Sequence, residues 1–216
     1  MRNPSLIIFD CDGVLVDSER LSHAVLRQML SEHGVDLSLD QTLEHFMGTS
    51  TEMCLEVLAG LIGQSAPADF MAQFRQRSFD AFRRELTPVE GARDLLTTLP
   101  HLYCVASNGP REKMRFTLGH TGLLPLLEGR LFSAQDVGRP KPAPDLFLHA
   151  ANVLGADPAR CVVIEDSPTG VTAARSAGMP VLGFAAMGQA KKLLDAGATA
   201  VFSSLSQLPR LLAGVK

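Results

Sequence analysis

Two aspartates, Asp10 and Asp12, directly follow a short apolar segment near the start of the chain, residues 6–9. Further polar residues end or connect later apolar segments: Ser107 and Asn108, Lys141 within GRPKPAPD, and Glu165 with Asp166. If the apolar segments are parallel strands, their carboxyl ends meet at one edge of a sheet, where open α/β proteins bind their ligands. The polar side chains are therefore expected to converge on one crevice.

Four carboxylates in one crevice repel one another, so a cation among them is favoured. Oxygen ligands without a nearby His or Cys favour Mg²⁺. Prolines on both sides of Lys141 limit backbone freedom and help to aim its long side chain. A dication, a lysine and a hydroxyl together make a site suited to a phosphate group.

Five apolar segments predict buried strands, because they are partly β-branched and end in small or polar residues. They are LIIF, LYCVAS, CVVIED, VLGFAA and AVFSS. The segments GARDLLTTL, REKMRFTLGHTG, PDLFLHAANVLG and TGVTAARSAG have helical spacing, and several of them end in Gly. Strands that alternate with helices predict an α/β fold with a doubly wound parallel sheet.

One region breaks this alternation. From about residue 18 to residue 86 the pattern is helical, with apolar residues every four positions from Leu21 and two further helices expected at 51–62 and 68–84. We therefore predict a core formed by residues 1–16 and 87–216, with a helical domain, residues 17–86, inserted after the first strand. Hinges are expected at 16–18 and 86–90.

Composition excludes several classes of protein. The chain has 216 residues, of which 46% are hydrophobic, and a net charge of -3, so it lacks the basic surface that nucleic-acid binding requires. No apolar run approaches the roughly 18 residues of a membrane span. The four cysteines have no CxxC spacing, which favours buried thiols over a zinc site. A cytoplasmic protein is expected.

Four motifs occur in order along the chain: DCDGVLVDS, SNG, KPAPD, and EDS followed by TG. Together they resemble the haloacid dehalogenase superfamily of aspartate-dependent phosphatases, and the helical insert resembles the cap of its β-phosphoglucomutase-like subgroup. The resemblance implies a monomeric, Mg²⁺-dependent phosphatase that forms an aspartyl-phosphate. It further implies a small phosphorylated metabolite as substrate, either a sugar phosphate or a sugar-acid phosphate such as 6-phosphogluconate.

The resemblance also implies a role for each core residue. Asp10 is expected to be the nucleophile, and Asp12 the acid and base. Mg²⁺ is expected to bind Asp10, the backbone carbonyl of Asp12, and Asp166, with support from Glu165. The phosphoryl group is expected to contact Ser107, Asn108 and Lys141.

Candidate substrate contacts in the insert are Glu19, Ser22, Gly48 with its neighbours in the turn 47–51, and Arg75. The sequence is equally consistent with each of them being an ordinary residue of a helix surface or a turn. For this reason the sequence identifies the chemistry of the core more firmly than the group that the insert recognises.

Two alternative functions fit part of the pattern. A mutase of the β-phosphoglucomutase type carries a cap histidine and an arginine at positions where this chain has Ser22 and Thr51. A phospho-receiver signalling module also gathers acidic residues and a lysine around Mg²⁺, but its phosphorylated aspartate ends a later strand, and here that strand ends in Ser107. A non-catalytic binding protein would not require all four motifs.

Overall fold

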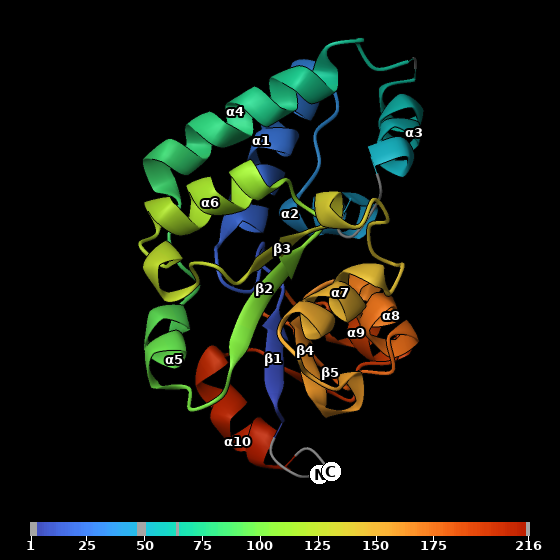
Figure 1. Ribbon diagram of the computed structural model, residues 1–216. Helices are drawn as coiled ribbons and strands as arrows, with labels where there is room; N and C mark the ends of the chain where they lie inside the picture. Colours follow the sequence, from blue (N-terminus) through green and yellow to red (C-terminus); the bar gives the residue numbers. More distant parts are fainter. Residues whose placement is uncertain (1–3, 47–50, 64, 215–216) are drawn as a thin grey trace. The chain divides into compact units, whose positions relative to one another are not determined.

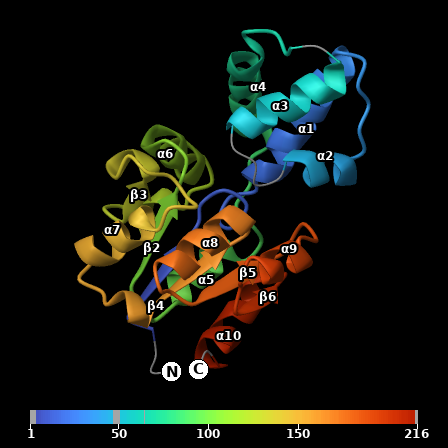
Figure 2. The same ribbon diagram turned by 90° about the vertical axis from the view of Figure 1, so that its right-hand side faces the viewer.

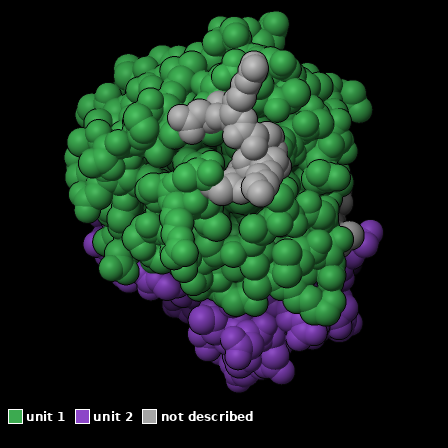
Figure 3. All heavy atoms as spheres, turned by 90° about the horizontal axis from the view of Figure 1, so that it is seen from below, with its two compact units in different colours: residues 1–17, 87–216 green, residues 18–86 purple. Residues whose placement is uncertain are grey.

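The computed structural model describes residues 4–46, 51–63 and 65–214. The chain forms two compact units, one made of residues 1–17 and 87–216 and the other of residues 18–86 (Figure 3). The smaller unit is continuous in sequence, whereas the larger one is assembled from two separate segments.

The larger unit is built on a six-stranded sheet in the order β3-β2-β1-β4-β5-β6, with every neighbouring pair parallel. The strands are β1 Leu6–Phe9, β2 Tyr103–Ser107, β3 Leu131–Ser133, β4 Cys161–Glu165, β5 Val181–Phe184 and β6 Ala200–Phe202. The predicted doubly wound α/β fold is confirmed. The direction of strand order reverses between β1 and β4, where ligand sites form in such sheets.

Helices cover both faces of this sheet (Figures 1 and 2). They are α5 Ala92–Thr98, α6 Arg111–His120, α7 Asp145–Val153, α8 Pro168–Ser176, α9 Ala190–Asp195 and α10 Leu208–Gly214. Leu6 and Ile8 of β1 share a buried cluster with residues of α7, α8 and α9. Strand residues between them face the other side, where the Tyr103 hydroxyl donates to the Leu96 carbonyl of α5.

The smaller unit contains four helices, α1 Ser18–Glu32, α2 Leu39–Phe46, α3 Thr51–Ile62 and α4 Phe70–Glu85. Its core is its own: Leu26, Met29, Leu30, Phe46, Leu58 and Phe70. Helices α1 and α4 pack together and are joined by an ion pair between Glu32 and Arg77, with 2.6 Å between Oε1 and Nη1. Within the part of the chain that is described, no helix is both long and apolar enough to cross a membrane.

The two segments that lead out of the larger unit run side by side. Val16 forms an antiparallel bridge with Pro88, and the N–H of Val89 donates to the carbonyl of Leu15 over 2.9 Å. The N–H of Asp17 donates to the carbonyl of Thr87 over 3.1 Å. These bonds fix both connections at the edge of the larger unit, directly after the loop that carries Asp12.

The separate core of the smaller unit can be tested by a truncation. Leu30→Ala is expected to lower the free energy of unfolding of this unit by about 3 kcal/mol, because it leaves a cavity at a fully buried position. Leu55→Ala removes the same atoms from a side chain that is 38% exposed. It is expected to change the free energy of unfolding of this unit by less than about 0.5 kcal/mol. Amide hydrogen exchange of α1 and α4 measures both, and equal effects would contradict a buried core there.

Candidate active site

The two aspartates of the first motif lie at the end of β1. The N–H of Asp10 donates to the carbonyl of Ile164 in β4 over 2.9 Å, which extends the pairing of the two strands by one residue. The chain then turns at Gly13, whose φ of 78° lies in the left-handed region that favours glycine. The N–H of Gly13 donates to the carbonyl of Val16, so the loop that carries Asp12 is compact.

The ammonium of Lys141 contacts three oxygen atoms at this edge of the sheet. Its Nζ lies 2.6 Å from Asp10 Oδ1, 2.7 Å from Glu165 Oε1 and 2.8 Å from the carbonyl oxygen of Ala106. It also lies 4.7 Å from the centre of the Phe147 ring, a distance at which a cation is attracted to the ring face. Burial alone would lower the pKa of Lys141, but Asp10 and Glu165 outweigh it and raise this pKa above its ordinary value.

Asn108 positions Lys141 through its side chain. Its Nδ2 donates to the carbonyl of Lys141 over 3.2 Å, and the N–H of Lys141 donates back to Asn108 Oδ1 over 2.8 Å. The Lys141–Pro142 peptide bond that follows is cis. Both ends of the Asn108 amide are therefore used to hold the lysine loop against the end of β2.

Glu165 is held on both of its oxygens. Oε1 accepts from Lys141, and Oε2 accepts from the N–H and the hydroxyl of Ser167 over 3.0 and 2.9 Å. Ser167 in turn caps α8, because its Oγ accepts from the N–H of Gly170. Gly170 lies so close that a Cβ there would overlap the Glu165 carboxylate. Glu165 thus joins Lys141 to the start of α8.

The carboxylates exceed the positive groups in number. Burial, followed by the nearby Glu165 and Asp12, raises the pKa of Asp10 to about 7, although Lys141 acts in the opposite direction. Asp12 pairs with Lys113, whose Nζ lies 2.9 Å from Asp12 Oδ1. With Asp166, which is 8% exposed, four carboxylates therefore share two ammonium groups, which leaves a net charge of -2 when all are ionised.

This excess of negative charge fits a hard dication. Among the described residues, no three His, Cys, Asp or Glu side chains are grouped so that they alone could hold a metal. Mg²⁺ does not require such a group, because it keeps several waters and uses one or two protein carboxylates. Asp10 and Asp166, at the ends of adjacent strands, and the backbone carbonyl of Asp12 supply a suitable set.

Ser107 completes the site at the end of β2. Its side chain is buried, and its Oγ accepts from the N–H of Gly109 over 3.0 Å. A Cβ on Gly109 would lie 3.3 Å from this oxygen and 3.6 Å from Asp12 Oδ2. The two oxygens are therefore close to the same point, which the glycine leaves open.

Some of the residues that hold the site were not predicted from the sequence. Gln189 donates from Nε2 to the carbonyls of Asp166 and Phe184, over 3.2 and 3.3 Å, and so connects the ends of β4 and β5. Ser167 and Gly170 belong to quoted motifs, but Lys113 and Gln189 carry no signal beyond ordinary helix and loop residues.

Residues predicted to contact substrate from the insert belong to the smaller unit. Glu19 lies in α1, where its carbonyl is 2.7 Å from Nδ1 of the buried His23. Arg75 is exposed on α4. Gly48 lies outside the described residues.

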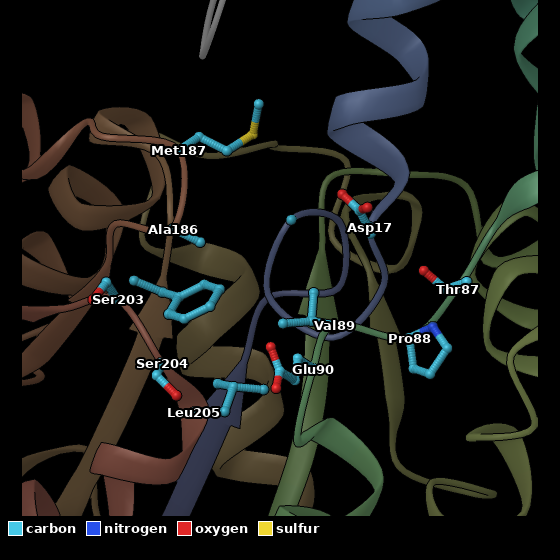
Figure 4. A pocket seen from close by; sticks show the side chains of 12 residues that line it. Asp17, Thr87, Pro88, Val89, Glu90, Ala186, Met187, Ser203, Ser204 and Leu205 are labelled. Atoms are coloured by element: carbon cyan, nitrogen blue, oxygen red, sulfur yellow. The ribbon is translucent and has the colours of Figure 1, made fainter.

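A cavity of about 380 Å³ in the larger unit begins at Gly13, the residue after Asp12, but none of the predicted reacting residues lines it (Figure 4). Its lining comes from three places: Gly13 and Asp17, residues 87–90, and the end of β5 with residues that follow β5 and β6. Asp17 and Thr87 are the two residues where the chain leaves and re-enters the larger unit. The cavity therefore borders the two connections between the units.

Comparisons with known proteins identify the family of this chain. A family model described as haloacid dehalogenase-like hydrolase matches residues 4–178. The 6-phosphogluconate phosphatase of Escherichia coli K12 is 33% identical over 206 residues, covering 95% of this chain and 93% of that protein. The β-phosphoglucomutase of Bacillus subtilis is 30% identical, covering 88% and 86%.

A solved structure is similar over the whole chain. A haloacid dehalogenase family hydrolase from Deinococcus radiodurans R1, with bound phosphate and sodium, is 34% identical with a TM-score of 0.87, covering 99% of this chain and 97% of that one. The predicted resemblance to this family, to its β-phosphoglucomutase-like members and to bacterial 6-phosphogluconate phosphatase is confirmed. The chain therefore belongs to the haloacid dehalogenase-like hydrolases, and its enzyme class is phosphatase.

Proposed function

We propose that this phosphatase is Mg²⁺-dependent and hydrolyses a small phosphorylated sugar or sugar acid through an aspartyl-phosphate on Asp10. The observation that carries the proposal is the contact of Lys141 with both Asp10 and Glu165. One oxygen of Asp10 is held by the ammonium at the point where the strand order reverses. The carboxylate is therefore fixed by one oxygen, and its other oxygen can act as the nucleophile.

In the first step, an oxygen of Asp10 forms a bond to phosphorus while the bond from phosphorus to the substrate alcohol breaks. Asp12 gives its proton to the leaving oxygen. In the second step, Asp12 takes a proton from water, whose oxygen attacks phosphorus and releases inorganic phosphate and free Asp10. Lys141 and Ser107 bind the phosphoryl oxygens during both transfers.

A bound Mg²⁺ would offset the charge of the phosphoryl group and of the carboxylates around it. Asp10, Asp166 and the backbone carbonyl of Asp12 are the proposed ligands, with Glu165 in support. Glu165 supports the set indirectly, because both of its oxygens are already bonded to Lys141 and Ser167.

6-Phosphogluconate is the proposed first substrate. The name of the Escherichia coli relative, which is similar over nearly the whole chain, supports it. In the smaller unit, Arg75, Glu19 and Gly48 are the proposed substrate contacts, and the guanidinium of Arg75 suits a sugar-acid carboxylate. The proposed role of residues 17–86 is that of a cap that excludes water during transfer to Asp10, with hinges at 16–18 and 86–90.

A mutase is the second candidate, because the Bacillus subtilis relative is a β-phosphoglucomutase. The sequence places Ser22 and Thr51 where that type of enzyme uses a histidine and an arginine. This chain therefore lacks the two cap side chains with which that type of enzyme returns the phosphoryl group to the sugar. Transfer of the phosphoryl group from Asp10 to water is then favoured. The cytoplasmic location and the monomeric state stay predictions from the sequence.

The substrate and the metal can be tested together. With Mg²⁺, phosphate release from 6-phosphogluconate is expected to exceed release from neutral sugar phosphates and nucleotides by about tenfold or more in kcat/KM. EDTA is expected to abolish turnover and added Mg²⁺ to restore it, whereas excess Ca²⁺ inhibits, since it takes more ligands at longer distances. Full turnover in EDTA would contradict the metal, and faster interconversion of glucose 1-phosphate and glucose 6-phosphate than phosphate release would identify a mutase.

The nucleophile can be tested by Asp10→Asn. An amide keeps an acceptor for Lys141 but cannot attack phosphorus, so kcat is expected to fall by at least about 1000-fold while the fold is retained. Asp195→Asn alters an exposed aspartate on α9 and serves as the matched control. Rapid acid quenching followed by mass spectrometry should detect phosphorylated wild-type protein only. Activity of Asp10→Asn within tenfold of wild type would rule out the assignment.

The link from α8 to the site can be tested by Gly170→Ala. The added methyl displaces Glu165 from Lys141, so kcat/KM is expected to fall by about 100-fold, the effect of misplacing a catalytic group by about 1 Å. Stability is expected to fall by about 3 kcal/mol because a buried ion pair is broken. Gly119→Ala in α6 meets only an ordinary contact with Leu124 and is the control. Unchanged activity and melting temperature in Gly170→Ala would show that Glu165 does not depend on this contact.

A further inference from the structure

Lys113 makes an ion pair that the mechanism above does not use. It lies in the first turn of α6, and its Nζ is 2.9 Å from Oδ1 of Asp12. The side chains are 24% and 14% exposed, so this pair is far more enclosed than the surface pairs of the larger unit, such as Arg115 with Glu128. A pair sheltered from water holds its geometry better than a solvated one.

The ion pair lies next to the turn that follows β2. Nζ of Lys113 contacts Oδ1 of Asp12, and Oδ2 of Asp12 lies near this turn. A Cβ on Gly109 would be 3.6 Å from Oδ2, 3.3 Å from the hydroxyl oxygen of Ser107 and 3.7 Å from Cδ of Lys113. Oδ2 is thus on the side where the phosphoryl-binding hydroxyl lies.

The charge distribution of a helix does not favour a lysine in the first turn of α6. The first turn of a helix carries a partial positive charge from its unpaired N–H groups, so a cation there is unfavourable. The neighbouring Arg111 is paired with Asp136, which lies in the short 3-10 helix after β3, with 2.7 Å between Nη2 and Oδ2. The contact with Asp12 compensates for this unfavourable position of Lys113, and such local conflicts are typical of functional sites.

We propose that Lys113 is a positioning residue for the acid step, which holds the side chain of Asp12 beside the phosphoryl-binding hydroxyl of Ser107. In transfer to Asp10, the bond from phosphorus to the bridging oxygen breaks and the proton of the Asp12 carboxyl moves to that oxygen, which leaves Asp12 as a carboxylate that the charge of Lys113 stabilises. The inference rests on the proposed aspartyl-phosphate mechanism. It differs from a phosphate-binding role, in which Lys113 would contact the transferred group itself.

Leaving groups of different basicity separate these two roles. A sugar alkoxide needs a proton as it leaves, whereas p-nitrophenolate leaves without one. The quantity kcat/KM reports the reaction up to transfer to Asp10, so it isolates the acid step from later hydrolysis. Lys113→Met keeps the length of the side chain and removes its charge, and Lys113→Arg keeps the charge.

Lys113→Met is expected to lower kcat/KM by about 100-fold for the best sugar phosphate, the effect of misplacing a catalytic group by about 1 Å, and by less than about threefold for p-nitrophenyl phosphate. Lys113→Arg is expected to recover most of the loss. Arg115→Met removes an exposed ion pair from the same helix and is the control. It should leave kcat/KM unchanged for both substrates. Should Lys113→Met fail to fold, Lys113→Gln is measured in the same way.

Equal losses on both substrates would overturn the proposal in favour of phosphate binding or a structural role, and so would no loss on either. Failure of Lys113→Arg to recover activity on the sugar phosphate would also count against it. Failure of the proposed mechanism itself gives a different result, since Asp10→Asn would then stay active and acid quenching would trap no phosphorylated wild-type protein.

Discussion

The ammonium of Lys141 is buried among three acceptors that come from three neighbouring strands: the residue after β1, the end of β4 and the carbonyl of Ala106 in β2. A buried charge that loses one partner costs about 3–5 kcal/mol, so all three must be in place at once. The register of the central strands, the loop that Asn108 clamps and the start of α8 therefore depend on one positive charge. The carboxylate of Asp10, the proposed nucleophile, receives its position as part of the same arrangement.

Charge also connects the parts of the proposed chemistry. Lys141 and Lys113 each hold a different aspartate, and the carboxylates around them still leave the site negative. A phosphate ester is itself an anion and would be repelled from such a site. The proposed dication would do two things here: it would neutralise the carboxylates and make the site attractive to substrate. The proposed dependence on metal and affinity for phosphate would then follow from the same excess of acidic groups.

The sequence predicts the helices and strands of this protein better than the contacts between them. Apolar segments ending in Asp10, Ser107 and Glu165 revealed most of the sheet and its functional edge, because buried parallel strands have a strong local pattern. β3 was not predicted, since three residues are too few for such a pattern, and α2 was not separated from its helical surroundings. The partnership of Lys113 with Asp12 could not be predicted, because it depends on where α6 begins relative to the loop after β1. Local patterns predict elements, whereas contacts between elements depend on the assembled fold.

The turn after β2 has a consequence for the chemical lifetime of the protein. Asn108 precedes Gly109, a pair that readily closes to a succinimide in flexible peptides, because glycine does not shield its backbone nitrogen. In the folded chain that nitrogen donates to Ser107, and both ends of the Asn108 amide are bonded to the main chain of Lys141. Ring closure requires these bonds to break, and the carboxylate that results would face the carbonyl oxygen to which Asn108 now donates. Spontaneous deamidation of Asn108 is therefore coupled to opening of the loop. The fraction of time that this loop is open sets the rate at which Asn108 is lost.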